Sequence, residues 1–437
     1  MNKNKKSWAV IGSGTLGLCI SKHLIEAGHR VEILDAGNAL GGLAATCKSD
    51  SYEWDKYYHV ISPHDRYLLD LLEELKLSSL VAWRNTKTDF FDGCAISPLN
   101  NVWDFIRLPG LGYVDKARLA LNILLASQIK QGDHLESISA QSWLTKWSGR
   151  NTYENLWRPL LRSKLGQNAH LASGSYIWSV IRRFYSARQG TQRTEAFGYL
   201  TQSYRAVIDA LHASLVNNGT SIRLGTVVHE VSPRDAECVV KTNQGTFSYD
   251  EVVFTGPCSA ASSICPMLSN SEHEGLNSIQ YQGVVCTSAL IKKPLTGAYM
   301  TYITDESTPF TTVIQMSALV GTERFGGNHL IYLPRYVPSS DSLLSEEEPE
   351  IENRFICGAT RMYADLKESD FISVKTFKAP HVLAIPTLNY SKSRPQVITS
   401  VPGFNICNSA QITNAALAVN ESVEHAANCS TVLLAKK

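Results

Sequence analysis

A short glycine-rich segment near the start of the chain has the spacing of a dinucleotide-binding turn. Gly12, Gly14 and Gly17 form a GxGxxG pattern between an apolar run at 8–11 and a stretch of helical periodicity that ends at Gly28. The first glycine permits a tight turn, the second lets backbone approach a pyrophosphate, and the third allows close packing of helix on strand. N–H groups at the start of the helix would bind the phosphate. The cofactor contacts expected here are Gly12, Gly14, Thr15, Leu16 and Gly17.

An acidic residue follows at the end of the next strand. Residues 31–34 have strand character, and Asp35 comes about 20 residues after the glycines. A carboxylate in this place accepts hydrogen bonds from a ribose hydroxyl and repels a cofactor that carries a 2′-phosphate. We therefore expect Asp35 and the adjoining Ala36 among the cofactor contacts. The order of strand, glycine turn, helix and acid-tipped strand favours a Rossmann-like unit over an ordinary glycine-rich turn.

A second glycine motif, Gly-Gly-Leu-Ala-Ala-Thr, occupies residues 41–46. A domain that binds only a nicotinamide cofactor needs no glycine pair in this place. With this motif the chain resembles the flavin amine oxidase superfamily, which includes protoporphyrinogen oxidase-like, phytoene desaturase-like and UDP-galactopyranose mutase-like proteins. The resemblance implies FAD as the cofactor, with Gly42, Leu43 and Ala44 beside the flavin. Many members have arginine at the position of Leu43. This departure weakens the case for an ordinary amine oxidase more than the case for FAD.

The resemblance extends to three later segments. It implies that backbone near Val228 contacts the adenine ring and that the small Gly256 lies near the dinucleotide. It also implies that a strand and a helix at the C-terminal end close the FAD site. Asn408 ends that strand, where many FAD proteins have aspartate, and Ala416 lies in the helix expected from 414 to about 434.

Tyr58 and His59 are the candidate catalytic residues. They stand in an aromatic, strand-like segment at 51–61. By resemblance to mutase-like and oxidoreductase members, His59 would lie beside the flavin ring and pair with it or move a proton. For both residues the alternative is simple packing in apolar surroundings.

Arg158, Arg162 and Lys164 place three cations within seven residues. The two arginines are four apart and so share a helix face, and Pro159 indicates a kink or a first helical turn. Such a cluster could hold a carboxylate or phosphate, which arginine binds through two parallel hydrogen bonds. A similar stretch occurs in protoporphyrinogen oxidase-like oxidoreductases, and an anionic substrate would suit it. The alternative is a basic helix face in solvent.

The strands and helices needed to position these residues indicate an α/β protein, α+β overall. A chain of 437 residues is too long for one compact core, so we expect two interleaved domains. A Rossmann-like FAD-binding domain is expected from 1–82, 200–265 and 386–437. A substrate-binding domain of mixed sheet plus helices is expected from 83–199 and 266–385. The main elements expected within them are helices at 62–75, 119–129, 138–147 and 203–216, a hairpin at 237–249, and strands at 221–231, 284–291, 298–303 and 329–333. Tyrosines of the last strands and the residues after them could line a pocket: Tyr299, Tyr302, Tyr332 and Tyr336.

The overall composition excludes several classes of partner. The net charge of +1 gives no indication of nucleic acid, and no apolar run approaches the ~18 residues of a membrane-spanning helix. The basic start of the chain precedes an apolar run too short for a signal-peptide core. The ten cysteines are scattered singly without metal-ligand spacing, so we expect no metal and reduced thiols in a cytoplasmic protein. Peripheral membrane contact, oligomeric state and a covalent flavin link stay open.

Three functions are compatible with these features. The first is an FAD-dependent oxidoreductase that passes hydride from an organic, anionic biosynthetic substrate to flavin N5. The second is an isomerase or mutase that uses reduced flavin without net redox change, which the Tyr58–His59 region and Leu43 favour. The third is a flavin-fold binding protein that has lost its chemistry.

Overall fold

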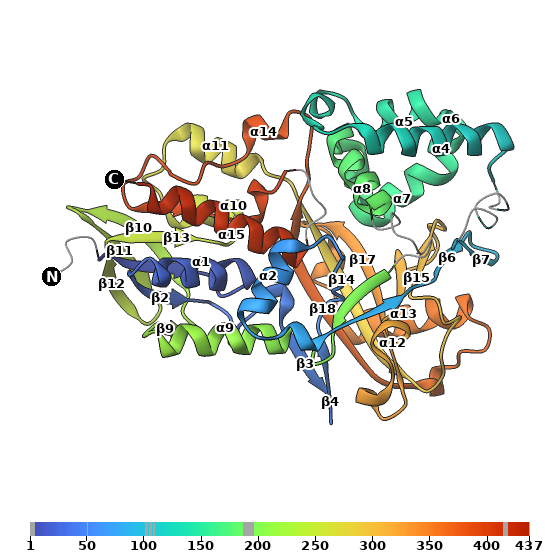
Figure 1. The fold of residues 1–437 in the computed structure, drawn as a ribbon, viewed down its shortest axis with the longest axis horizontal. Coiled ribbons are helices and arrows are strands. Elements are labelled where there is room, and N and C mark those ends of the chain that lie inside the picture. The colour runs from blue at the N-terminus through green and yellow to red at the C-terminus, as the bar shows by residue number, and fades with distance from the viewer. Residues whose placement is uncertain are drawn as a thin grey trace.

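The computed structural model describes residues 5–49, 51–100, 104, 107, 110–186, 196–413 and 418–436, with backbone alone for 184–186. Figure 1 shows a parallel sheet covered by helices in one half of the molecule and a larger mixed sheet in the other, with a group of helices above it. The α/β class predicted from the sequence is confirmed. The division into two domains stays a prediction, although the two large sheets are built from the segments assigned to them.

The parallel sheet brings the two ends of the chain together. Its strand order is β19-β13-β1-β2-β9, and all neighbours in it are parallel. The strands are short and mostly buried, because helices pack on one face of the sheet and the three-stranded sheet described below packs with α10 (Cys258–Ile264) on the other. The strands are β1 (Ser7–Ile11), β2 (Arg30–Leu34), β9 (Ser221–Arg223), β13 (Glu251–Phe254) and β19 (Phe404–Ile406).

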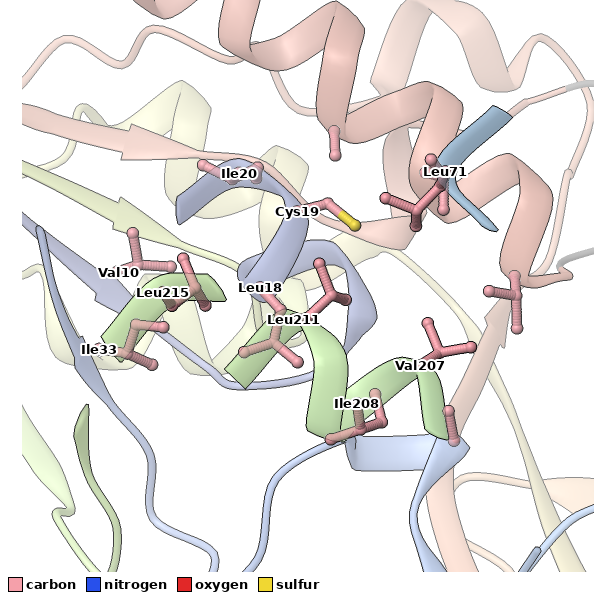
Figure 2. Close-up of a cluster of buried hydrophobic side chains, with 14 of the residues drawn as sticks. Val10, Leu18, Cys19, Ile20, Ile33, Leu71, Val207, Ile208, Leu211 and Leu215 are labelled. Atoms are coloured by element: carbon pink, nitrogen blue, oxygen red, sulfur yellow. The ribbon is translucent and has the colours of Figure 1, made fainter. Parts of the chain in front are cut away.

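Four helices of this half share one apolar core with the sheet. Leu18 of α1 and Leu211 of α9 are fully buried, and Figure 2 shows them close together, with Leu215 of α9 next to Val10 and Ile33 of the sheet. Because each helix carries its apolar residues on one side, burying that side fixes its position on the sheet. The helices are α1 (Thr15–Glu26), α2 (Arg66–Glu74), α9 (Arg205–Asn217) and α15 (Val419–Leu434).

The start of α2 differs from the prediction. A helix was predicted from residue 62, but it begins at Arg66. The Asp65 carboxylate accepts a hydrogen bond from Ser62 N (2.8 Å), which holds the preceding residues in a turn. Leu68 N, in the first helical turn, donates instead to Asn420 Oδ1 of α15 (3.1 Å). A tertiary contact therefore caps this helix.

A separate three-stranded sheet lies beside the parallel sheet. The hairpin predicted at 237–249 is confirmed, and its turn is fixed by the Asn243 side chain, which accepts from Val227 N and donates to Gly225 O. The expected strand at 221–231 is divided, because residues 224–227 form the crossing between the two sheets. The strands here are β10 (Val228–Arg234), β11 (Glu237–Thr242) and β12 (Gly245–Tyr249).

The mixed sheet has seven strands in the order β18-β14-β17-β16-β15-β6-β7. Neighbours are antiparallel except β15 and β6. The strands predicted at 284–291, 298–303 and 329–333 all lie in it. Its strands are β6 (Thr88–Phe91), β7 (Ile96–Pro98), β14 (Tyr281–Ile291), β15 (Met300–Ile303), β16 (Thr312–Gln315), β17 (His329–Pro338) and β18 (Phe371–Ala384).

Helices and two small ribbons complete the fold. The helices predicted at 119–129 and 138–147 are present as α4 and α5, and Pro159 lies in the first turn of α7 after a π-helical turn. The segment predicted as a strand at 51–61 is a strand only over 52–55. The helices are α4 (Tyr113–Gln128), α5 (Ala140–Ser148), α6 (Arg150–Thr152), α7 (Arg158–Leu165), α8 (Gly174–Ser186), α10 (Cys258–Ile264), α11 (Asn270–Ser278), α12 (Ser317–Val320), α13 (Glu348–Met362) and α14 (Tyr390–Ser393). The ribbons pair β3 (Thr46–Ser49) with β4 (Tyr52–Asp55) and β5 (Val81–Asn85) with β8 (Ala196–Leu200).

In the part of the chain that the structure describes, no helix combines the length and the apolar character needed to cross a bilayer.

Candidate flavin and substrate site

The three glycines of the first motif have different surroundings. A Cβ on Gly12, whose φ is +112°, would overlap Thr255 Oγ1, and a Cβ on Gly17 would overlap the Gly12 carbonyl oxygen. A Cβ on Gly14 would meet no atom of the described residues within 4 Å. The first and third glycines are therefore needed for the turn and for packing, whereas the second faces open space at the end of β1. This is the arrangement that leaves room for a phosphate.

The start of α1 offers backbone donors to that space. Gly14 is the N-cap residue, and within the described ranges no side chain caps the helix. The first turn contains no acidic residue, so nothing in it opposes an anion. Uncapped N–H groups and the positive end of the helix dipole together suit a pyrophosphate.

Asp35 lies against the glycine turn. Its Oδ2 accepts hydrogen bonds from Ser13 N and Ser13 Oγ (both 2.6 Å), and its Oδ1 accepts from Gly37 N (2.6 Å). The carboxylate thus holds the turn in place, and a ribose would share it with Ser13. Ala36 is exposed next to it. The sequence interpretation omitted Ser13, which stands between two of the motif glycines and which only its contact with Asp35 reveals.

The second glycine motif adjoins the first. Gly41 N donates to Ser13 O (2.9 Å), and Gly14 and Gly41 form an isolated parallel bridge. A Cβ on Gly42 would lie 3.2 Å from Gly14 Cα, and both glycines of the pair have positive φ, at +103° and +56°. Two motifs separated in the sequence thus form one glycine-lined surface. Because glycine has no side chain, a cofactor could come close to the protein backbone there.

His59 is fixed to the glycine pair. Its Nε2 lies 3.0 Å from the Leu43 carbonyl oxygen, and because a carbonyl only accepts, Nε2 carries the proton and Nδ1 keeps its lone pair. Desolvation by the surrounding protein lowers the pKa of the imidazole, so the neutral form prevails at pH 7. The ring also packs edge-on against Tyr204, with centroids 5.0 Å apart. A neutral histidine with one free nitrogen can accept a proton.

Asp55 is a buried acid in the wall of a small cavity beside His59. Its Oδ1 accepts a hydrogen bond from Tyr204 N (3.0 Å). Burial raises the pKa of the Asp55 carboxyl to about 7, although the charge of Arg324 acts in the opposite direction. The cavity, also lined by Tyr204 and Tyr332, measures about 20 Å³, which is room for one water molecule. Sequence reasoning missed Asp55, whose signal was an acid at the end of an aromatic strand.

The raised pKa of Asp55 predicts a specific dependence of stability on pH. Between about pH 4 and pH 7 the folded protein keeps a proton that the unfolded chain has released, so the free energy of unfolding falls as the pH rises. Asp55→Asn should remove this fall. The free energy of unfolding of the variant, relative to that of the wild type, should therefore rise by at most about 4 kcal/mol between pH 4 and pH 8. Urea unfolding at a series of pH values measures the difference. A difference that does not change with pH would show that Asp55 is ionised at low pH.

Lys164 of α7, Tyr336 of β17 and Tyr58 of the loop after β4 converge. Lys164 Nζ, on α7, donates to Tyr58 Oη (2.9 Å), and Tyr58 Oη lies 2.9 Å from Tyr336 Oη of β17. The ammonium also lies 4.9 Å from the centre of the Tyr336 ring and 5.5 Å from that of Tyr58. Burial raises the pKa of both phenols, so each remains a protonated donor. This cluster joins two residues singled out in the sequence with one of the tyrosines expected near a pocket.

The two arginines of the predicted cation cluster point elsewhere. Arg158 pairs with Glu154 (2.6 Å), Arg162 pairs with Glu306, and both guanidinium-bearing side chains are well exposed. They share one helix face, as their spacing predicted, but Lys164 lies on another. The structure therefore does not bring the three cations together, and binding of a substrate by Arg158 or Arg162 stays a prediction.

Comparison with known proteins agrees with this geometry. The sequence profile described as flavin containing amine oxidoreductase matches residues 17–358, more than half of the chain. The chain belongs to this family. Membership confirms FAD as the cofactor and the flavin-dependent oxidoreductase class predicted from the glycine motifs.

Individual relatives of this flavin amine oxidoreductase are distant. A 15-cis-phytoene desaturase of Glycine max is 27% identical over 154 residues, which are 31% of this chain and 27% of the relative, so the chain spans about a quarter of that relative's length. Solved structures match nearly the whole chain, and two of them serve as examples. A proposed protoporphyrinogen oxidase of Exiguobacterium sp. 255-15 has a TM-score of 0.80 at 16% identity and full coverage of both chains. A reduced UDP-galactopyranose mutase has a TM-score of 0.76 at 15% identity, covering 99% of this chain and 95% of the other. At such identities the likeness shows the fold.

Three residues of later segments that were expected near FAD, Val228, Gly256 and Asn408, form contacts within the protein. Val228 begins β10 and pairs with Thr242 in the hairpin. The Asn408 side chain donates to Gly256 O (2.9 Å) and accepts from Ala410 N (3.1 Å), so it links the ends of two adjacent parallel strands. Contact of Val228, Gly256 or Asn408 with FAD stays a prediction. Ala416 lies outside the described residues.

Proposed function

We propose that this flavin amine oxidoreductase removes hydride from an organic, anionic substrate that binds beside Lys164. The observation that carries the proposal is the position of the Lys164 ammonium, half-buried between Tyr58 and Tyr336. Among the described residues no carboxylate forms an ion pair with it, in contrast to Arg158 and Arg162. An uncompensated cation in partly desolvated surroundings favours an anionic ligand.

The tyrosines give this site a directed donor. Lys164 donates one hydrogen bond to Tyr58 Oη. The Tyr58 hydroxyl can therefore donate its own proton to Tyr336 or to a substrate oxygen. Because the ammonium and both phenols are held by one another, little side-chain freedom is lost when a substrate binds. We assign Lys164 and Tyr58 to holding and orienting the anionic group.

His59 is assigned to proton transfer on the cofactor side. Its Nε2–H is committed to the Leu43 carbonyl, next to Gly42 at the glycine-lined surface, and its Nδ1 can accept a proton. Gly14, Asp35 and the start of α1 would hold the dinucleotide part of FAD. When bound, the flavin accepts a hydride equivalent from the substrate. We also propose that 1–82, 200–265 and 386–437 form the FAD-binding domain and that the remainder binds substrate.

A spectral titration tests the proposal. The purified protein should show the absorbance of oxidised flavin, and anaerobic addition of small organic acids or phosphorylated compounds should bleach it in at least one case. The neutral ester or dephosphorylated analogue of that compound should bleach it much more slowly. Equal bleaching by the neutral analogue would refute the anionic class, and a colourless protein would refute the oxidoreductase.

A flavin-dependent isomerase or mutase is the second candidate. The observation that favours it is Leu43, whose side chain packs in the apolar cluster that contains Tyr57 and Tyr58, where many superfamily members carry an arginine. Such an enzyme needs reduced flavin but consumes no oxidant. Substrate conversion that depends on prior reduction with dithionite, without reoxidation of the flavin, would select this candidate over the first.

A further inference from the structure

Helix α4 has its apolar side facing outward. Its exposed residues include Tyr113, Val114, Leu121, Leu124 and Leu125, which are 81%, 74%, 54%, 48% and 39% exposed. The buried side of the same helix carries Lys116 and Asn122 together with Leu119 and Ala126. In α9, by contrast, Leu211 and Leu215 are buried and the exposed face is largely polar. A soluble helix normally follows the pattern of α9, so the outer face of α4 is suited to a partner.

The apolar area continues beyond α4. Trp147, near the end of α5, is 42% exposed, and α5 packs against α4. Figure 1 shows both helices, with α6, in the group at the upper right, at the periphery of the molecule and away from the parallel sheet. We call the exposed apolar residues of α4 together with Trp147 the α4–α5 surface.

Cations surround the α4–α5 surface. Arg118, Lys130, Lys146 and Arg150 are exposed, and within the described ranges none of them forms an ion pair with an acid. Arg118 donates to the Lys146 carbonyl oxygen (3.4 Å), and the Lys146 ammonium lies 5.7 Å from the centre of the Trp147 ring. Leucines and aromatic rings next to unpaired lysines and arginines are typical of a surface that lies in the headgroup region of a bilayer.

We propose that the α4–α5 surface docks this protein on an anionic lipid bilayer. Charge distinguishes a membrane from a second copy of the chain. In a two-fold dimer the same patch meets itself, so the unpaired cations of one copy would approach those of the other. Anionic headgroups instead complement these cations while Leu121, Leu124 and Trp147 enter the interface. The docking does not depend on the bound flavin or on the proposed substrate.

Vesicle flotation with the full chain tests this inference. The wild type should float with vesicles of phosphatidylglycerol and phosphatidylcholine and bind vesicles of phosphatidylcholine alone at least tenfold more weakly. Leu121→Glu combined with Leu124→Glu should lower binding to the mixed vesicles at least tenfold. Arg118→Gln combined with Lys146→Gln should lower it severalfold and weaken its dependence on salt.

A matched control separates docking from general charge. Val216→Glu combined with Met267→Glu adds the same charge at exposed apolar residues elsewhere and should leave binding within twofold of the wild type. Circular dichroism and thermal unfolding establish that each variant is folded. The proposal is overturned if the wild type does not float, if the control loses as much binding as the α4 variant, or if light scattering shows a dimer that Leu121→Glu with Leu124→Glu converts to a monomer.

Discussion

Replacing Gly14 with glutamate is expected to give a folded protein without FAD. A side chain at this position starts into open space, so the turn and the packing of α1 on β1 are kept. The new carboxylate would stand at the uncapped start of α1, where the pyrophosphate would bind, and both its volume and its charge exclude the phosphate. We expect FAD affinity to fall by a factor of at least ~100, since the charge-assisted hydrogen bonds to the phosphate are lost. Flavin absorbance per mole of purified protein measures the result.

Two further glycine variants are the controls for this experiment. Gly14→Ala adds volume without charge and should retain much of the FAD. Gly17→Val should fail to fold, because its Cβ would overlap the Gly12 carbonyl oxygen and no flexible side chain can move away. Full flavin content in Gly14→Glu would contradict the assignment of this turn to the cofactor.

Replacing Lys164 with methionine should slow flavin reduction by the anionic substrate about 100-fold or more, while FAD content stays unchanged. Methionine keeps much of the volume between the two tyrosines but removes the charge and the donor to Tyr58. Removal of one positioned donor from an active site costs roughly 10²–10³-fold in rate. Stopped-flow reduction under anaerobic conditions gives both the rate and the substrate affinity.

Arg162→Met is the matched control on the same helix. Arg162 is exposed and paired with Glu306, so its loss should change the reduction rate by less than about threefold, as for an exposed ion pair. A larger effect of Arg162→Met than of Lys164→Met would show that the substrate binds on the outer face of α7. The reduction rate of Tyr58→Phe should lie between those of Lys164→Met and Arg162→Met, because this variant loses the bridging hydroxyl and keeps the cation.

The sequence alone determined the cofactor and the local elements that we assign to its binding. The glycine motifs, Asp35 and the hairpin at 237–249 were all predicted, because each depends on neighbours within a few tens of residues and on backbone conformations that only certain residue types adopt. The FAD assignment came from the second glycine pair and the resemblance that it carries.

Only the tertiary structure decided which polar groups meet. Lys164 follows Arg162 by two residues and so points roughly 200° away around the helix, but whether that side faces solvent or Tyr58 depends on how α7 packs against β17. Burial of Asp55 likewise requires Tyr204, about a third of the chain away, and the start of α2 is set by Asn420. Periodicity fixes the faces of an element, whereas its partner is selected by the packing of the whole core, which no local pattern contains.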